Sequence, residues 1–300
     1  MQATPELLIG SALGLLTAFL WAISTNVYKS ISDEATPLGI TAIKMWAAML
    51  FMTIIVMLPF RTTPFFVPFE SLIFLIASVS VGLIFGDIVY LTAQERIGVS
   101  YAFPIANIYP ITTYIIAIFL VGETIILSRF IGVIFAVLGV TLISREQAAK
   151  NEAQEMKKFD VLGIGLAFIA ALCWSLGSVL LQIGVTDIDP IDANFVRMLF
   201  GGAILVPLFL TVTKRGMPTP TRRATKIIIL AGFFGTTIAT LLYTYVVKLI
   251  GASVAALLGS TSPLFAVPIS ILILKESFSR KSLLGVLLTV FGVALVVLAI

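Results

Sequence analysis

The chain of 300 residues is 59% hydrophobic and only 11% charged, whereas soluble domains carry about 25% charged residues. This number of charged residues is too small to cover a water-facing surface. The composition therefore predicts an integral membrane protein. The sequence has one cysteine and no histidine, which excludes His-ligated metals and histidine bases, and no metal or cofactor is expected. The net charge of +4 comes without an aromatic-plus-basic stripe, so no nucleic-acid partner is expected.

Ten apolar segments follow one another along the chain, and each is long enough to cross a hydrocarbon core of about 30 Å. All are predicted to be α-helices, because unpaired backbone groups in lipid leave only helices or closed barrels. The first lacks the basic region of a signal peptide and is therefore retained as a helix. The segments are 7–28, 39–59, 71–94, 100–121, 128–144, 161–182, 191–212, 226–248, 252–274 and 280–300.

The second half of the chain repeats the first at a constant offset of 153 positions, as between Gly98 and Gly251 or Pro110 and Pro263. One gap-free register over almost the whole chain indicates a tandem duplication. The predicted units are 1–144 and 161–300, joined by the polar linker 145–160. Because five helices per unit is an odd number, the second copy enters the membrane from the opposite side. The predicted fold is therefore all-α, with ten transmembrane helices in a 5+5 inverted repeat, as in secondary transporters.

Several matched residues carry a resemblance to a known family. They are Trp21 and Trp174 in the first helix of each unit, Lys44 and Arg197 early in the second, and Gly251, Ala252, Ser253, Ala255, Pro263, Glu276, Gly285 and Gly292 in the last two. This pattern resembles the drug/metabolite transporter superfamily, and more narrowly its ten-helix EamA-type members. The resemblance implies a carrier that moves small organic metabolites, such as amino acids or related compounds, by alternating access, with or without proton coupling. A monomer or homodimer is expected.

Polar and aromatic side chains recur at helical spacing in the first helix of each unit. Trp21, Ser24 and Thr25 share one face of segment 7–28, and Trp174 lies at the equivalent place in the second unit. One interpretation is an aromatic wall of a substrate cavity. The alternatives are packing through small residues or, for tryptophan, an anchor at the membrane interface.

Asp87 is the only acid well inside a predicted span, on a helix face shared with Tyr90. A carboxyl group in this position could bind a proton or a cationic part of a substrate. The alternative is a structural ion pair with Lys44, which the predicted topology places at a similar depth. Both roles can coexist, so Asp87 and Lys44 are the candidates for ion coupling.

Arg197 is the counterpart of Lys44 and could bind an anionic or carboxylate group, or could extend toward lipid headgroups. Prolines interrupt the fourth and ninth segments, and broken helices at matching places indicate a transporter site. The candidates near these breaks and on the neighbouring faces are Asn107, Ser260 and Tyr243. Glu123 and Glu276 are instead expected to cap the helices that follow them.

The leading functional hypothesis is a secondary transporter of the cell membrane, not an enzyme. An intramembrane enzyme or a membrane scaffold are alternatives, and a channel is a weaker one because no repeated pore motif is visible. Three basic residues flank the helices on the side of the N-terminus, and fourteen flank them on the other side. Basic loops stay in the cytoplasm, so both termini are predicted to lie outside.

Overall fold

The computed structural model describes residues 5–58, 64–151, 160–265 and 280–298, and these residues form helices and turns with no strand. Eight of the described helices are long and apolar enough to cross a membrane. The predicted class, an all-α multi-pass membrane protein, is therefore confirmed. Such helices satisfy every backbone group within the segment, which is what the bilayer interior demands.

The first half of the chain contains seven α-helices and one π-helix, η1, which continues α3 into α4. In this π-helix the hydrogen bonds span five residues instead of four. The elements are α1 (Pro5–Lys29), α2 (Pro37–Met57), α3 (Phe69–Ser78), η1 (Val79–Gly86), α4 (Asp87–Ile97), α5 (Val99–Ala106), α6 (Tyr109–Val121) and α7 (Leu127–Asn151).

The second half follows the same plan, again with a π-helix, η2, inside a long helix. Helix α7 runs into the predicted linker as far as Asn151, and helix α8 begins directly after Asp160. The elements are α8 (Val161–Val185), α9 (Pro190–Lys214), α10 (Arg222–Gly232), η2 (Phe233–Ile238), α11 (Ala239–Ser260) and α13 (Arg280–Leu298).

Short polar side chains start several helices by accepting bonds from the first free N–H groups. Thr36 caps α2 and Asp189 caps α9, each followed by a proline at the first helical position. Asp160 caps α8 and also binds Arg96 at 2.8 Å. The hydrogen bond from Arg96, together with the backbone bonds at the cap, lowers the pKa of Asp160.

The two halves share their irregular features at the offset seen in the sequence. Gly98 and Gly251 have nearly the same backbone conformation, with φ of 76° and 82°, a region that residues other than glycine rarely adopt. The two π-helices also occupy equivalent places in the chain. These matching irregularities show that the duplication extends to backbone detail.

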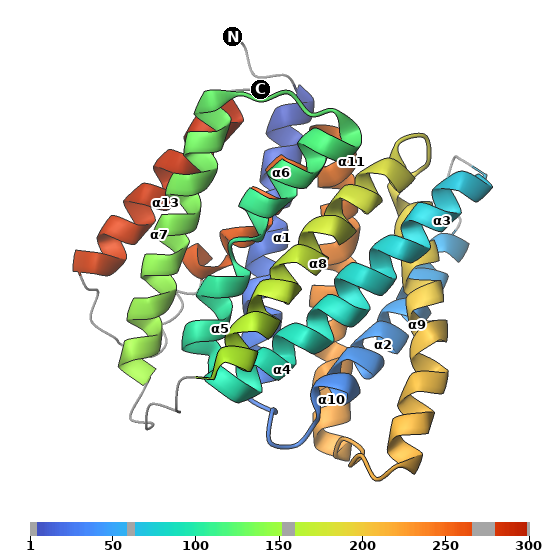
Figure 1. The fold of residues 1–300 in the computed structure, drawn as a ribbon. Helices are drawn as coiled ribbons and strands as arrows, with labels where there is room; N and C mark the ends of the chain where they lie inside the picture. Colours follow the sequence, from blue (N-terminus) through green and yellow to red (C-terminus); the bar gives the residue numbers. More distant parts are fainter. Residues whose placement is uncertain (1–4, 59–63, 152–159, 266–279, 299–300) are drawn as a thin grey trace.

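Helices α7 and α13 are counterparts, and they pack side by side away from the rest of the bundle (Figure 1). A Cβ added to Gly132 would lie 2.7 Å from the carbonyl of Gly292, and one added to Gly139 would lie 2.5 Å from that of Gly285. The beginning of α7 thus meets the end of α13, so the two helices run antiparallel. An inverted repeat requires this relation, and the small residues permit the close approach.

The predicted count of ten helices stays a prediction. The longest described helix, 222–265, includes the predicted eighth segment and the start of the ninth, with a break at Gly251. The rest of the ninth segment, with Pro268 and Glu276, lies outside the described residues. The tenth corresponds to the shorter apolar helix Leu283–Leu298. The start of α1 and the end of α13 lie at the same end of the bundle (Figure 1), as an even number of membrane crossings requires.

Candidate functional site

A cavity of about 200 Å³ lies between the two repeats, near the middle of the helices. Both halves contribute to its wall, and the described helices α7 and α13 do not. All eleven candidate residues from the sequence line it. Its described lining consists of Trp21, Ser24, Thr25, Tyr28, Lys44, Ser78, Gly82, Leu83, Asp87, Tyr90, Leu91, Gln94, Phe103, Asn107, Tyr109, Trp174, Gly177, Ser178, Arg197, Gly235, Thr236, Thr240, Tyr243, Gly259, Ser260 and Ser262.

Lys44 and Asp87 form an ion pair in the wall of the cavity. The Lys44 Nζ lies 2.5 Å from Asp87 Oδ2, and the indole N–H of Trp174 donates to Asp87 Oδ1 at 2.9 Å. Both carboxylate oxygens are therefore occupied, one by a residue from each half of the chain. The pair expected as an alternative to transport chemistry is present in the structure, and its effect on transport stays a prediction.

Arg197 occupies the place in the second half that Lys44 has in the first, but it forms no ion pair with any acid that the structure describes. Its guanidinium donates to the hydroxyl of Thr244 at 3.3 Å, and its Nε has no hydrogen-bond partner among the described residues. Only 4% of its surface is exposed. The alternative expectation, a side chain extended toward lipid headgroups, is therefore wrong for this structure, because the guanidinium turns into the protein.

Two tryptophans join the repeats across the cavity. The indole N–H of Trp21 donates to the carbonyl of Gly235 at 3.0 Å, and the Trp21 ring lies 5.2 Å from that of Tyr243. Trp174 mirrors this arrangement, with its ring 4.8 Å from Tyr90. Because both indoles bond within the protein interior, neither acts as an interfacial anchor. Each instead forms an aromatic wall of the cavity with a tyrosine from the opposite half.

The broken helices bring polar groups into the same cavity. Asn107 directly follows the end of α5, and its amide nitrogen has no partner among the described residues; α11 ends at Ser260. Tyr109 begins α6 and donates through its hydroxyl to the carbonyl of Ala256 at 2.7 Å. This bond links the break in the first half to the matching region of the second.

The described lining of the cavity reaches further toward one end of the bundle than toward the other. Tyr28 and Gln94 line it at the ends of α1 and α4, and Phe103 lines it in the middle of the short helix α5. Toward the other end the lining stops at Ser178 and Arg197, about two turns short of the end of α8 and of the start of α9. The described cavity therefore comes closest to the end of the bundle where α1 finishes.

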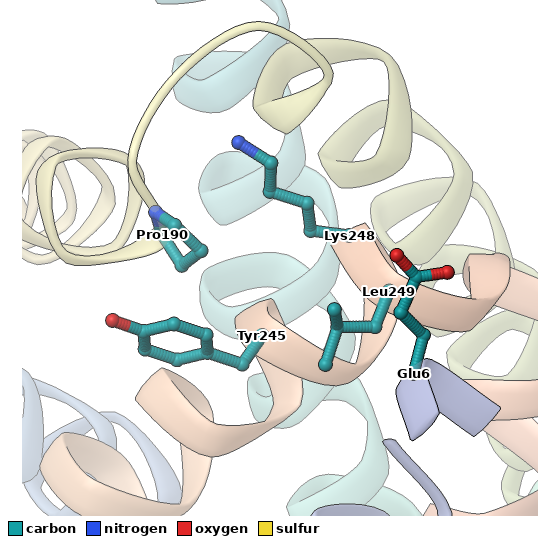
Figure 2. A pocket seen from close by; sticks show the side chains of 5 residues that line it. All are labelled: Glu6, Pro190, Tyr245, Lys248 and Leu249. Carbon is teal, nitrogen blue, oxygen red and sulfur yellow. The ribbon is translucent and has the colours of Figure 1, made fainter. Parts of the chain in front are cut away.

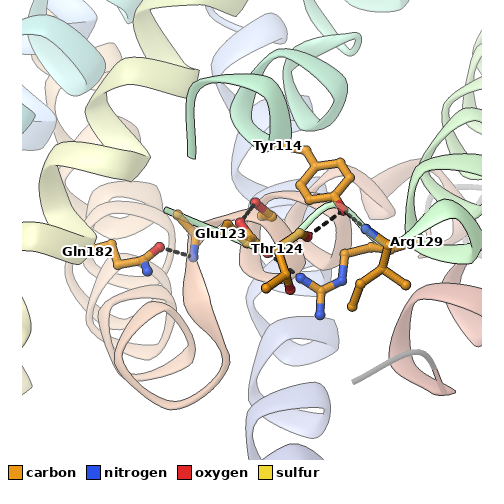
Figure 3. Close-up of polar contacts among 8 residues, drawn as sticks. Tyr114, Glu123, Thr124, Arg129 and Gln182 are labelled. Carbon is orange, nitrogen blue, oxygen red and sulfur yellow. Dashed lines mark hydrogen bonds and ion pairs between the residues drawn. The ribbon is translucent and has the colours of Figure 1, made fainter. Parts of the chain in front are cut away.

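Polar contacts hold the helices together at the opposite end (Figure 3). Glu123, in the turn after α6, binds both Arg129 at the start of α7 and the hydroxyl of Ser253 in α11. The hydroxyl of Tyr114 accepts a hydrogen bond from the backbone N–H of Ile126 at 2.9 Å. Glu123 thus pairs with Arg129 in the first turn of α7, and its expected role as a cap of this helix stays a prediction. Tyr114 belongs to this cluster instead of the cavity, and Glu276 lies outside the described residues.

A second hollow, of about 380 Å³, lies at the end of the bundle where α1 and α9 begin, and Figure 2 shows the residues around it. Its described lining is Glu6, Pro190, Tyr245, Lys248 and Leu249. Lys248 donates to the carbonyl of Ile188 at 2.6 Å, which fixes its amine against the loop before α9. None of the candidate residues lines this hollow, and neither do the residues at the helix breaks near Asn107 and Ser260. The central cavity therefore remains the candidate site.

The fold and the cavity define a class of protein: a multi-pass membrane protein with a polar cavity between two related halves. The family model of the EamA-like transporter family matches residues 8–145 and 161–298, and the chain belongs to that family. It is thus a membrane transporter, and its family implies a small-molecule substrate.

Several known proteins are similar to it. An uncharacterized transporter of Archaeoglobus fulgidus is 24% identical over 289 residues, which cover 95% of this chain and 97% of that protein. One from Synechocystis is 24% identical over 298 residues, or 96% and 90% of the two chains. Human solute carrier family 35 member G1 is 27% identical over 157 residues, or 52% and 42%. A solved structure titled only as a crystal structure of a protein shares the fold, with a TM-score of 0.74, 17% identity and coverage of 96% and 97%.

Proposed function

We propose that the chain is a secondary carrier that moves small organic metabolites across the cell membrane by alternating access. The observation that carries this proposal is the central cavity, because equivalent positions of both repeats line it. Inverted-repeat carriers place their substrate at such an interface, and the repeats move against each other to expose it to each side in turn. The two breaks and the two π-helices offer matching points where the helices can bend.

The residues of the cavity support binding more than bond cleavage. Its described acid, Asp87, is paired with Lys44 and bonded to Trp174, and the described lining holds no second acid to work with it in general acid–base chemistry. The rest of the described lining is hydroxyl, amide, aromatic and small groups, with the cation Arg197. Such groups orient a solute, which favours a carrier over an intramembrane enzyme.

We further propose that the open side of the cavity faces the cytoplasm. It extends toward the end of the bundle where α1 and α4 finish, which is the side of the more basic loops. The cluster of Glu123, Arg129 and Ser253 then closes the outer side. In this arrangement the structure corresponds to the inward-open stage of the cycle, with both termini outside.

Counterflow in proteoliposomes tests the carrier function. Solutes that raise the melting temperature of the purified protein are selected, and a labelled one is then added outside vesicles that contain the unlabelled one. A carrier accumulates the label transiently, whereas an enzyme or a scaffold does not. If a solute binds the protein but no counterflow occurs, the proposal is wrong.

Two glycine substitutions provide a matched pair for this experiment. Gly259→Leu places a side chain in the cavity, where an added Cβ would lie 2.8 Å from the Trp21 ring. Gly165→Leu adds the same side chain on α8, where nothing lies within 4 Å. We expect Gly259→Leu to abolish counterflow and Gly165→Leu to retain it. Equal counterflow in the two variants would show that the cavity is not the path.

A further inference from the structure

The two repeats carry equivalent cations, but only one repeat supplies the acid. Lys44 and Arg197 are separated by the repeat offset, and the position that corresponds to Asp87 is Thr240. In the first half the result is an ion pair at 2.5 Å. In the second half the hydroxyl of Thr240 donates to the carbonyl of Thr236, so the residue that corresponds to Asp87 carries no charge.

Leaving Arg197 in this state is energetically unfavourable. Arginine stays protonated in proteins, and a buried charge without a partner costs several kcal/mol. Among the described residues, its side-chain hydrogen bond is to the hydroxyl of Thr244, at 3.3 Å. None of the described carboxylates forms an ion pair with it. The guanidinium Nε, aimed at no described partner, is thus a donor that a ligand in the cavity can satisfy.

The charge balance of the cavity determines what kind of ligand fits. The charged residues of its described lining are Lys44, Asp87 and Arg197, and the first two neutralise each other. One positive charge therefore remains. An ammonium group would have to share the carboxylate of Asp87 with Lys44 and Trp174, and it would add a positive charge to a cavity that already holds one unbalanced cation. A solute with a single negative charge balances the cavity better than a zwitterion or a cation.

The groups around Arg197 suggest the rest of the solute. Thr244 follows Tyr243, whose ring packs against Trp21 and whose hydroxyl meets Ser178 at 2.8 Å. Flat aromatic surfaces bind flat apolar groups, and Asn107 supplies a further unpartnered N–H donor in the same cavity. Resting on the carrier function above, we propose that the substrate is a monocarboxylate with an aromatic or similarly flat body. Its carboxylate takes the place beside Arg197 that Asp87 holds beside Lys44.

A series of solutes with one aromatic body and different charges tests this proposal. The probes are phenylpropionate, its neutral amide, the zwitterion phenylalanine and the cation phenylethylamine. Affinity is measured on the purified full chain by thermal shift and by quenching of tryptophan fluorescence, and each probe is also tested in counterflow. We expect phenylpropionate to bind at least about tenfold more tightly than the other three, because only it offers Arg197 a carboxylate without bringing a second positive charge into the cavity.

Substitution of Thr240 makes the test specific. Thr240→Asp places an acid where the first repeat has one, so it should pair with Arg197 and compete with the ligand. Thr240→Asn has the same size without the charge and controls for the change in shape. We expect Thr240→Asp to weaken phenylpropionate binding at least about tenfold more than Thr240→Asn does. The Arg197→Lys variant should bind phenylpropionate more tightly than the Arg197→Gln variant, because lysine keeps the positive charge.

The outcomes separate this proposal from the carrier function. Equal losses in Thr240→Asp and Thr240→Asn, or no preference for the anion in the unmodified chain, would overturn the monocarboxylate. Counterflow of the amide or the cation without the anion would overturn it and leave the carrier intact. Binding of phenylpropionate that depends on Arg197, without counterflow, would leave the anion site intact and contradict the carrier.

Discussion

Asp87 is the residue on which the two halves of the cavity meet. Its carboxylate accepts from Lys44 of the first repeat and from the indole of Trp174 of the second. A buried ion pair adds little net stability over an apolar pair, but breaking it leaves an uncompensated charge. The ion pair fixes the position of α2 relative to α4, and the bond from Trp174 adds α8 to this arrangement. These contacts set the relative positions of the helices more than they add to the net stability.

Asp87→Asn should lower the melting temperature clearly, because it leaves Lys44 buried without an acid. The expected cost is about 3–5 kcal/mol. The double variant Lys44→Met with Asp87→Asn removes both charges and should recover most of the loss, which thermal unfolding in detergent measures. Transport of a bound solute is then measured at several pH values to test proton coupling. If Asp87 carries the proton, the pH dependence of transport should vanish in both variants. A single variant as stable as the unmodified chain, with an unchanged pH profile, would contradict both roles.

Glycine decides how the paired helices α7 and α13 approach each other. Added Cβ atoms at Gly132, Gly139, Gly285 and Gly292 would all lie within 3 Å of backbone atoms of the facing helix. In lipid, helices associate through such close packing because the hydrophobic effect does not drive them together. The pair lies at one edge of the bundle (Figure 1) and none of its described residues lines the cavity, so we assign it a structural role.

Gly139→Leu should destabilise the protein without reaching the cavity. A Cβ there would meet Thr289 Oγ1 at 2.4 Å and the Gly285 carbonyl at 2.5 Å, so the two helices must separate. We expect a loss of at least about 1–3 kcal/mol, seen as a lower melting temperature. The control Gly165→Leu, where nothing lies within 4 Å, should change stability by no more than about 0.5 kcal/mol. Equal melting temperatures for the two variants would contradict the packing described.

Among the described residues, one end of the molecule is strongly basic and the other offers little free positive charge. On the side where α1 begins, Arg129 is 7% exposed and bound to Glu123, and Lys248 is bonded to the carbonyl of Ile188. On the other side Arg222, Arg223 and Lys226 gather at the start of α10. The asymmetry of the loops therefore favours a cytoplasmic position for the basic end.

Thiol labelling in intact cells tests this orientation. In a Cys173→Ala background, a cysteine at Ala149, near the end of α7, should resist a membrane-impermeant reagent. A cysteine at Ile125, which is 76% exposed in the turn at the opposite end, should react. The reverse labelling pattern would place both termini in the cytoplasm.

Much of the cavity could be anticipated because inverted repeats place their interface at a predictable depth. The eleven candidate residues were chosen from helix faces and matched breaks, and all of them line one cavity. Their role in binding stays a prediction. The sequence did not indicate the π-helices, since a five-residue hydrogen-bond spacing has no compositional signature. It also did not indicate that Tyr114 and Glu123 belong to a cluster at one end, because their partners are set by packing.

By itself, the sequence determined the membrane class, the duplication and the resemblance to EamA-type transporters, since hydropathy, repeat register and motif spacing are properties of the chain alone. The tertiary structure decided which charges meet. Lys44 finds Asp87, Glu123 finds Arg129, and Arg197 finds only hydroxyl groups among the described residues. These pairings depend on how helices distant in sequence rotate and pack against each other, and a one-residue change of helix rotation turns a side chain by about 100°.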